Sequence, residues 1–304
     1  MLNNILKIIF LFLFLSCADE SISGSEEDVY PINPDNLDII TWNIQNYPKH
    51  SSTNTYLTDI INNLEGIDII ALQEIENATS LIELANSLEG NWEAHRFQSG
   101  NSGYGNLAFL INSESIMFQE PYSILDEHSA YFAYKPPFIL EFDYNNQHFI
   151  LINVHYKCCG DGNLDQSDPW DEEYRRLMAS FYLEEYISEN FNDENVIIMG
   201  DFNDELTDAS NNVFNVFLDN SDEYYFTDLP MAIEESHWEY WSYPSWPSHL
   251  DHILITNELF DEYENINSSC NTILIDNILN SGWAEYDNYI SDHRPVGISL
   301  DISE

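Results

Sequence analysis

Short apolar runs recur along the chain from Leu37 onward, and most of them end at a polar or charged residue. Such runs are typical of buried β-strands, whereas longer segments with apolar residues three and four positions apart are typical of helices. Because predicted helices alternate with strands and hairpins, the pattern indicates an α/β fold with a mixed sheet covered by helices. It predicts strands at Leu37–Ile44, Ile67–Glu74, Gly105–Ile111, Phe138–Phe142, His148–Val154, Val196–Met199 and Ser248–Ile255, and helices at Thr55–Leu64, Ala78–Leu88 and Trp170–Asn190.

The stretch Gly200-Asp201-Phe202-Asn203 directly follows the strand predicted at Val196–Met199. A spacing of two in extended backbone points the side chains of Asp201 and Asn203 the same way, so a carboxylate and a carboxamide converge on one small volume. The structural alternative is a turn, in which both residues bond their own backbone.

Further polar residues favour a functional site over a turn. Asn43 lies inside a predicted strand, where a buried amide requires hydrogen-bond partners or a place at the edge of the sheet. Glu74 and His155 stand at the ends of two other strands. Asp251 lies at the start of another strand, and Asp292-His293 precedes the last one.

The order of these motifs resembles that of the endonuclease/exonuclease/phosphatase superfamily, which contains DNase I, abasic-site endonucleases, neutral sphingomyelinases and inositol-polyphosphate phosphatases. The resemblance covers about Leu37 to Ile302. It implies a four-layered α/β sandwich of the DNase I type, with two mixed β-sheets packed face to face, helices outside and a site at one edge. The motifs are Trp42-Asn43-Ile44-Gln45, Leu72-Gln73-Glu74, Asn153-Val154-His155, Gly200-Asp201-Phe202-Asn203, Leu250-Asp251-His252 and Ser291-Asp292-His293.

The resemblance also implies a role for each matched residue. It makes Glu74 the main metal ligand, with Asn43 and Asp292 beside it. Asp201 and Asn203 would orient the attacking water and the phosphoryl oxygens. The imidazoles that flank the scissile phosphate would be those of His155 and His293, with Asp251 paired to His293. The residues implied in contact with the substrate are Asn43, Lys135 and Asn203.

Phosphate-ester hydrolysis needs an activated water, stabilisation of charge on the equatorial oxygens and a proton for the leaving oxygen. A hard divalent cation on carboxylates meets the second need, so we expect Mg²⁺ or Mn²⁺, with Ca²⁺ as an alternative structural ion. Histidines transfer protons near neutral pH, and a carboxylate behind His293 fixes its tautomer and raises its pKa.

Two positions and one segment bear on the substrate. Glu76 stands where DNase I-like enzymes carry an arginine two residues after the metal-binding glutamate, so a minor-groove contact is missing. Lys135 stands where the family often has a basic residue facing phosphate, and a solvated loop lysine is the alternative. Aromatic residues cluster around Trp241, between Glu234 and Pro247, and either stack on a ligand or pack in the core.

Residues 1–17 are interpreted as a lipoprotein signal peptide. Their apolar core is too short to span a membrane, and the end at Leu15-Ser16-Cys17 resembles a bacterial lipobox with Cys17 lipidated. An ordinary signal peptide is the alternative. Residues 18–36 have the composition of an acidic disordered tether, which resembles the export signal of some surface lipoproteins. We therefore expect an extracytoplasmic domain at 37–304, held at the outer membrane by its lipid alone and exposed at the cell surface.

The chain has 54 acidic and 8 basic side chains, for a net charge of -46. This field opposes broad attraction to nucleic acid or anionic lipid at low ionic strength. It is interpreted as a solubility adaptation to a salty medium, which screens it, and a local cation would still draw a phosphate into one site.

Three cysteines remain after Cys17, namely Cys158, Cys159 and Cys270. A Cys158–Cys159 bridge, one pair involving Cys270, and free buried thiols are all open alternatives.

The sequence thus predicts a monomeric, metal-dependent phosphodiesterase, and in the first hypothesis it is an extracytoplasmic endonuclease acting on DNA or RNA. The second hypothesis keeps the chemistry and changes the substrate to a phospholipid, as in sphingomyelinases, or to a small phosphate ester. The third is a non-catalytic binding module, against which the full set of catalytic residue types counts.

Overall fold

The computed structural model describes residues 35–64, 66–97, 106–234 and 236–302. The expected signal peptide with Cys17, and the expected tether as far as residue 34, lie outside these ranges. Asn36 is buried, and its side chain donates to Ser299 Oγ and to Asn267 O. The packed domain therefore includes Asn36. None of the helices in the described ranges has the length and apolar content that a membrane span requires.

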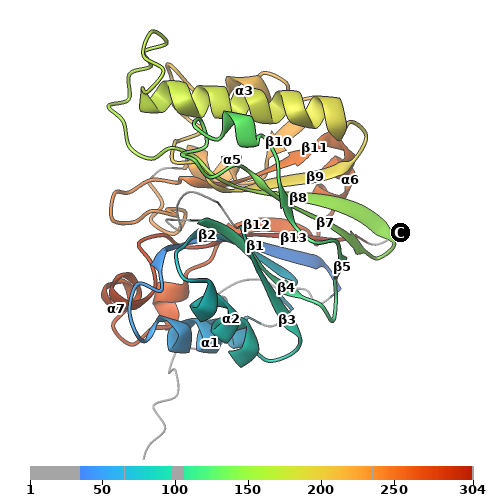
Figure 1. Ribbon diagram of the computed structural model, residues 1–304, viewed down its shortest axis with the longest axis vertical. Helices are drawn as coiled ribbons and strands as arrows, with labels where there is room; N and C mark the ends of the chain where they lie inside the picture. The colour runs from blue at the N-terminus through green and yellow to red at the C-terminus, as the bar shows by residue number, and fades with distance from the viewer. Residues whose placement is uncertain (1–34, 65, 98–105, 235, 303–304) are drawn as a thin grey trace, which may run out of the picture.

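Two mixed β-sheets lie face to face, with helices on their outer surfaces (Figure 1). This arrangement confirms the predicted four-layered α/β sandwich. The first sheet has the strand order β12-β13-β1-β2-β4-β3, in which β1 and β2 are parallel and all other neighbours are antiparallel. Its strands are β1 (Leu37–Tyr47), β2 (Ile69–Ile75), β3 (Trp92–Arg96), β4 (Asn106–Asn112), β12 (Ser269–Thr272) and β13 (Val296–Leu300).

The second sheet has the order β10-β11-β9-β8-β7-β5, and β6 also pairs with β7. β8 and β9 are its parallel pair. Its strands are β5 (Met117–Phe118), β6 (Tyr122–Ser123), β7 (Phe138–Tyr144), β8 (Gln147–His155), β9 (Asn195–Asp201), β10 (Tyr224–Phe226) and β11 (Asp251–Thr256).

The helices form the two outer layers. Those that cover the first sheet are α1 (Thr53–Asn63), α2 (Ala78–Ser87) and α7 (Trp283–Tyr289), and those that cover the second are α3 (Glu172–Asn190) and α4 (Asn215–Leu218). Two short helices, α5 (Leu229–Ile233) and α6 (Phe260–Tyr263), lie in connections near β10 and β11.

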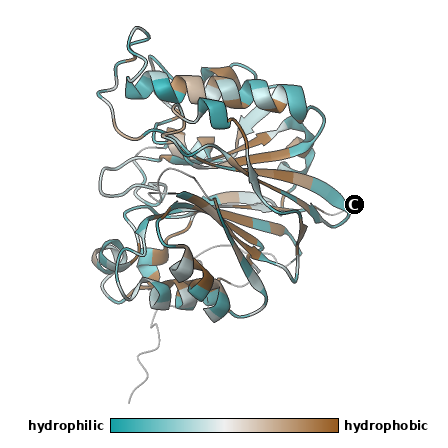
Figure 2. Cartoon of the chain, in the orientation of Figure 1, coloured by the Kyte–Doolittle hydropathy of each residue, from teal (hydrophilic) through white to brown (hydrophobic). Residues whose placement is uncertain are grey.

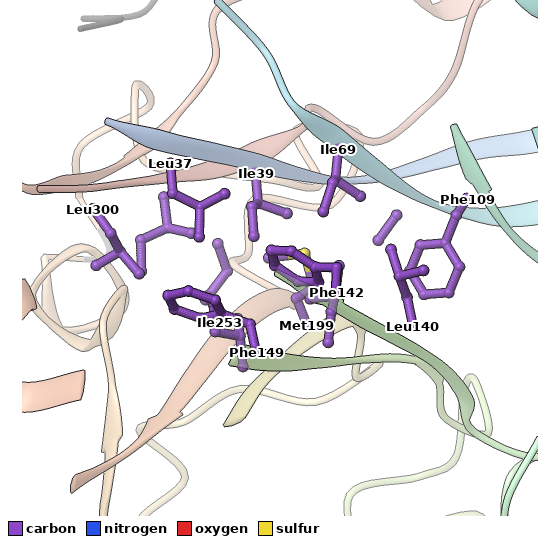
Figure 3. Close-up of a cluster of buried hydrophobic side chains, with 14 of the residues drawn as sticks. Leu37, Ile39, Ile69, Phe109, Leu140, Phe142, Phe149, Met199, Ile253 and Leu300 are labelled. Carbon is purple, nitrogen blue, oxygen red and sulfur yellow. The ribbon is translucent and has the colours of Figure 1, made fainter. Parts of the chain in front are cut away.

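Side chains alternate along each strand, so neighbouring residues belong to different layers. Ile39 packs between the sheets, whereas Ile40 packs under α1 and α2. Ile197 and Ile198 divide in the same way between the inter-sheet core and the layer under α3. Figure 3 shows side chains of both sheets meeting in the inter-sheet core, and the hydropathy colours of Figure 2 place the apolar residues along the sheets.

Some predicted boundaries are wrong. β1 extends to Tyr47 instead of ending at Ile44, because its pairing with β2 resumes after a register shift. α3 begins at Glu172 instead of Trp170, because the Asp171 side chain caps the helix by accepting the Tyr174 N–H. The sequence pattern also predicts none of the strands β3, β5, β6, β10 and β12.

Candidate active site

Strand pairing brings the predicted residues to one edge of the sandwich. β1 and β2 are parallel neighbours, so Asn43 and Glu74 lie near the same end of the first sheet. β8 and β9 are parallel too, and His155 stands directly opposite Asp201. Because β11 runs antiparallel to β9, its first residue, Asp251, also pairs with Asp201. The polar ends of both sheets therefore converge.

A glycine permits the close approach within the second sheet. Gly200 pairs with Val154 and has φ +155°, and a Cβ at this position would lie 1.9 Å from the Val154 carbonyl oxygen. A side chain would push the β8 backbone away, so only glycine fits. The residues that follow the pair, His155 and Asp201, are thereby held side by side.

Glu74 is aimed by a distortion of its strand. The pairing of β2 with β4 shifts register between Leu72 and Ile75, and Glu74 has φ +62°. Bulges redirect side chains, and non-glycine residues with positive φ cluster at functional sites. The half-buried Glu74 carboxylate faces the cleft, where its Oε2 accepts the Asn46 N–H at 2.9 Å.

Asn43 connects the carboxylates of the two sheets. Its Nδ2 donates to Asp201 Oδ2 at 2.9 Å and lies 3.5 Å from Glu74 Oε1. Its Oδ1 accepts the Gln45 N–H at 3.0 Å. The Gln45 side chain in turn donates to Asp292 Oδ2 at 2.6 Å. The predicted hydrogen-bond network around the buried amide is therefore present.

His293 lies between two buried carboxylates. Its Nδ1 is 2.8 Å from Asp251 Oδ2, and its Nε2 is 3.9 Å from Asp201 Oδ2. The His293 N–H bonds Ser291 Oγ, whose hydroxyl donates to the Asn43 carbonyl. The loop before β13 is thus fastened to β1, and the imidazole can neither rotate nor leave without breaking these bonds.

The two imidazoles differ in charge. Burial opposes the charged form of His293, but Asp251 and Asp201 outweigh it and raise the pKa of His293 to about 10. Burial lowers the pKa of His155 well below its ordinary value, and the positive charge of Lys135 acts in the same direction. Burial also raises the pKa of Asp201, to which the Asp251 charge contributes. Near neutral pH, His293 is an imidazolium and His155 is neutral.

His155 and Asn203 complete the group. His155 Nε2 lies 3.5 Å from Asp201 Oδ2, and its Nδ1 is buried without a hydrogen-bond partner among the described residues. Asn203 has φ +54°, its N–H donates to Asp201 Oδ1 at 2.9 Å, and its Nδ2 donates to Tyr156 O at 3.2 Å. A turn does form here, and it presents Asn203 to the cleft, so the turn and the functional interpretation hold together.

A cleft of about 1440 Å³ is lined by Gln45, Glu74, His155, Asp201, Asn203, Asp292 and His293. Lys135 also lines the cleft and lies half-buried among the charges of Glu74, Asp201 and Lys157, so it is no solvated loop lysine. Of the aromatic segment, Tyr243 and Trp246 reach the cleft, and the Tyr243 ring lies 4.7 Å from that of His293.

The donor set formed by Glu74, Asp292 and Asn43 fits a hard divalent cation. All three residues offer oxygen atoms, the ligand type that Mg²⁺ and Mn²⁺ prefer. Burial raises the pKa of Asp292, and the negative charge of Glu74 adds to the effect. A cation between these carboxylates would relieve their repulsion.

Sequence reasoning missed several supporting residues. Gln45 orients Asp292, and Ser291 joins the His293 loop to β1. Both belong to matched motifs, but their partners lie far away in the sequence. Asn153, on β8, donates to the carbonyls of Leu72 and Ala108 and thereby ties the two sheets together behind the site.

Two other clusters lie outside the predicted set. Asp228 Oδ2 is 2.6 Å from His252 Nδ1 and 3.1 Å from His249 Nε2, and all three residues are buried. The three cysteines in the described ranges are unpaired: Cys158 and Cys159 are exposed at the cleft with sulfurs 3.0 Å apart, and Cys270 is half-buried. The bridged alternatives are absent here, and two of the free thiols are exposed instead of buried.

Solved structures with this fold are found at low sequence identity. TDP2 from D. rerio, complexed with a single-strand DNA product, has a TM-score of 0.61 and 15% identity, covering 87% of this chain and 98% of that one. The human Nocturnin catalytic domain with bound sulfate has a TM-score of 0.56 and 16% identity, covering 89% of this chain and 96% of that one. An endonuclease/exonuclease/phosphatase from Bacteroides vulgatus has a TM-score of 0.59 and 13% identity, covering 88% and 99%.

A search of the curated proteins finds no match to this sequence. The sequence model of one family, described as Endonuclease/Exonuclease/phosphatase family, matches residues 40–293. This span runs from β1 to His293 and includes every residue that lines the cleft. On this evidence the chain belongs to the endonuclease/exonuclease/phosphatase family.

Proposed function

We propose that the protein is a metal-dependent phosphodiesterase that cleaves DNA or RNA outside the cytoplasm. The observation that carries the proposal is the His293 imidazolium, fixed by Asp251 and facing Asp201 at 3.9 Å, beside the oxygen donors of Glu74 and Asp292. Membership of the family supports a phosphoric ester hydrolase, and the donor set supports a divalent metal.

The proposed mechanism assigns each residue a task. Glu74, Asp292 and Asn43 would hold Mg²⁺ or Mn²⁺, which would supply positive charge to the phosphoryl oxygens when bound. Asp201, with its raised pKa, accepts a proton from the attacking water. The Asn203 N–H holds the Asp201 carboxylate in place.

Two basic side chains then contact the phosphate. His293 is protonated and donates to a phosphoryl oxygen, where the charge that develops in the transition state strengthens the bond. The Lys135 ammonium has no hydrogen bond or ion pair to the described residues, so it is available to the same phosphate. His155 is neutral and can accept a proton.

A nucleic-acid substrate has support from one comparison, because the D. rerio TDP2 structure contains a single-strand DNA product. The charge of this chain sets a condition on it. With a net charge of -46, the protein repels a polyanion at low ionic strength, so nuclease activity should require added salt.

The same charge favours a second candidate, the hydrolysis of a phospholipid headgroup or a small phosphate ester. Glu76 is exposed beside the cleft residue Glu74, where an arginine would help to hold a DNA groove. A long nucleic acid must lie along the acidic surface on either side of the cleft, whereas a small ester fits inside the cleft and avoids that surface. This candidate keeps every catalytic assignment and changes only the substrate.

The deciding experiment uses the soluble domain with Mg²⁺ or Mn²⁺ at low and high salt. Plasmid DNA, RNA, sphingomyelin and bis-p-nitrophenyl phosphate are offered in parallel, and Glu74→Gln is the matched variant. Metal-dependent nicking of plasmid that Glu74→Gln abolishes supports the nuclease. Turnover of the lipid or the small diester alone supports the second candidate. Absence of turnover for all four substrates contradicts the enzymatic proposal.

We also propose that Cys17 carries the lipid that anchors a monomeric domain to the outer membrane. The signal-like composition of residues 1–17 and the acidic stretch that follows support this. Replacing Cys17 by Ala should release the protein from the membrane fraction. A Cys17→Ala variant that still sediments with membranes contradicts the proposal.

A further inference from the structure

The few basic residues of this chain are unevenly placed. Only 8 lysines and arginines face 54 acidic side chains, and Lys135, Lys157 and Arg175 line the same cleft. Elsewhere the cations have protein partners. Arg294 bonds Asp276 in a buried pair, and Arg176 bonds the half-buried Asp204 at the border of the cleft. Three of the seven lysines and arginines in the described ranges thus line the cleft, together with seven carboxylates, so positive charge gathers at part of the cleft and not over its whole lining.

The three cleft cations lie close to one another. Lys135 and Lys157 interact electrostatically, and both act on the charge of His155. Arg175 stacks over the Tyr134 ring, with 5.7 Å between its guanidinium carbon and the ring centre. Tyr134 directly precedes Lys135 and also lines the cleft. The three cations therefore gather in one part of the cleft, where Glu172 acts on both Lys157 and Arg175.

Protein groups leave part of this charge unsatisfied. The Lys135 ammonium makes no hydrogen bond or ion pair with the described residues. Lys157 donates to Cys158 O at 2.7 Å and has one carboxylate nearby, Glu172 at 3.8 Å. This ion pair is long and only half-buried, so it contributes little. Arg175 uses Nε and Nη2 on the Ala130 carbonyl, which leaves Nη1 without an acceptor among the described residues.

The unused donors exceed what a single scissile phosphate requires. His293 and a divalent cation already face that phosphate in the proposed mechanism, and Lys135 stands next to them. The cleft, at about 1440 Å³, is larger than the roughly 300–1,000 Å³ typical of small-ligand pockets, so it has room for a second anionic group. Lysine and arginine together suit a dianionic phosphate, since arginine offers directed donors and lysine a point charge.

We propose that Lys157 and Arg175, with Lys135 shared, form a second anion subsite that binds a phosphomonoester of the substrate beside the scissile phosphate. The proposal rests on the phosphodiesterase function and specifies its substrate class. The preferred substrates carry a terminal phosphate close to the bond that is cleaved. A phosphorylated nucleotide end and a phosphorylated polyol both meet this description.

Equilibrium binding tests the subsite without requiring turnover. Calorimetry with Mg²⁺ present compares thymidine 3′,5′-bisphosphate with thymidine 5′-phosphate, and inositol 1,4-bisphosphate with inositol 1-phosphate. The wild-type protein should bind the bisphosphate of at least one pair about tenfold more tightly or better, the gain expected from a charged hydrogen bond. The pair that shows the gap identifies the nucleotide or the polyol as the source.

Two charge-matched variants locate the effect. Lys157→Gln should remove most of the gap between bisphosphate and monophosphate. Lys49→Gln, at a lysine outside the cleft that pairs with Asp287, should leave the gap unchanged. Equal affinity for both members of both pairs, or an unchanged gap in a folded Lys157→Gln protein, overturns the subsite. Absence of hydrolysis with the gap intact instead counts against the proposed function and leaves the subsite standing.

Discussion

Replacing Asp251 by Asn tests the importance of the carboxylate behind His293. The Asp251 carboxylate is fully buried and lies 2.8 Å from His293 Nδ1, so it faces the imidazolium without screening by water. Its loss removes the strongest of the three carboxylate effects that raise the pKa of His293, the others being those of Asp201 and Asp292. The histidine then loses its charge at a lower pH and is free to turn.

The magnitude follows from the type of bond that is lost. A hydrogen bond to a charged group contributes about 1.5–3 kcal/mol, which corresponds to a rate factor of about 10 to 150 if the transition state uses it fully. The variant also loses the carboxylate that keeps the His293 proton in position, and general acid–base catalysis contributes a rate factor of about 10²–10⁴. We expect kcat/KM of Asp251→Asn to fall by about 10² or more.

The assay is steady-state hydrolysis of bis-p-nitrophenyl phosphate over a range of pH, with folding checked by circular dichroism. Because the reaction needs His293 protonated, the loss of activity on the alkaline side should move to lower pH in Asp251→Asn. Asp228→Asn is the matched control, since Asp228 is equally buried and also contacts histidines. It should lower the free energy of unfolding by roughly 3–5 kcal/mol yet leave kcat/KM of the folded protein within about threefold. A folded Asp251→Asn protein with wild-type kcat/KM and an unmoved alkaline limb would refute the reasoning.

Three further predictions concern stability and salt. Gly200→Ala should destabilise the protein by roughly 2 kcal/mol more than Gly162→Ala in chemical denaturation, because its Cβ meets Val154 O whereas nothing lies within 4 Å of the other; equal losses would contradict the close approach of β8 to β9. Burial raises the pKa of Asp38 from 3.8 to about 7 in the folded state, so the stabilising effect of the neutral acid is complete below pH 4 and is lost as pH rises through 7. Asp38→Asn should therefore raise the melting temperature at pH 8 and leave it nearly unchanged at pH 4, and a gain independent of pH would rule out this cause. Added NaCl should lower KM for plasmid DNA and leave KM for bis-p-nitrophenyl phosphate almost constant, and an increase in KM for plasmid with salt would contradict the role given to the net charge.

The central strands could be predicted from sequence because they are buried on both faces. Strands such as β9 and β11 form continuous apolar runs, which leave little choice of structure. The edge strands could not, because β3 and β12 consist mostly of half-buried residues with no clear alternation. Their structure depends on the neighbouring strand and not on their own pattern.

The site was predictable as a set of residues and unpredictable as a geometry. The motif order identified Asn43, Glu74 and Asp201 as strand-end groups, and the parallel pairs place them together. The positive φ of Glu74 has no signal in its residue type, because it arises from the register shift between β2 and β4, whereas asparagine, as at Asn203, commonly adopts positive φ in turns. The partners of Gln45 and Lys157 likewise depend on loops that only the folded chain brings together.

The most direct test of the central claim combines metal binding with hydrolysis. Mn²⁺ is titrated into wild type, Glu74→Gln and Glu76→Gln, with calorimetry for binding and bis-p-nitrophenyl phosphate and plasmid for turnover. Glu74 faces the cleft, whereas Glu76, two residues further on, is exposed and lines no part of it. We predict that Glu74→Gln loses both binding and turnover, that Glu76→Gln keeps both, and that chelation abolishes the wild-type reaction. Turnover that survives chelation, or that Glu74→Gln retains in full, would contradict the assignment of this cleft as a metal-dependent phosphodiesterase site.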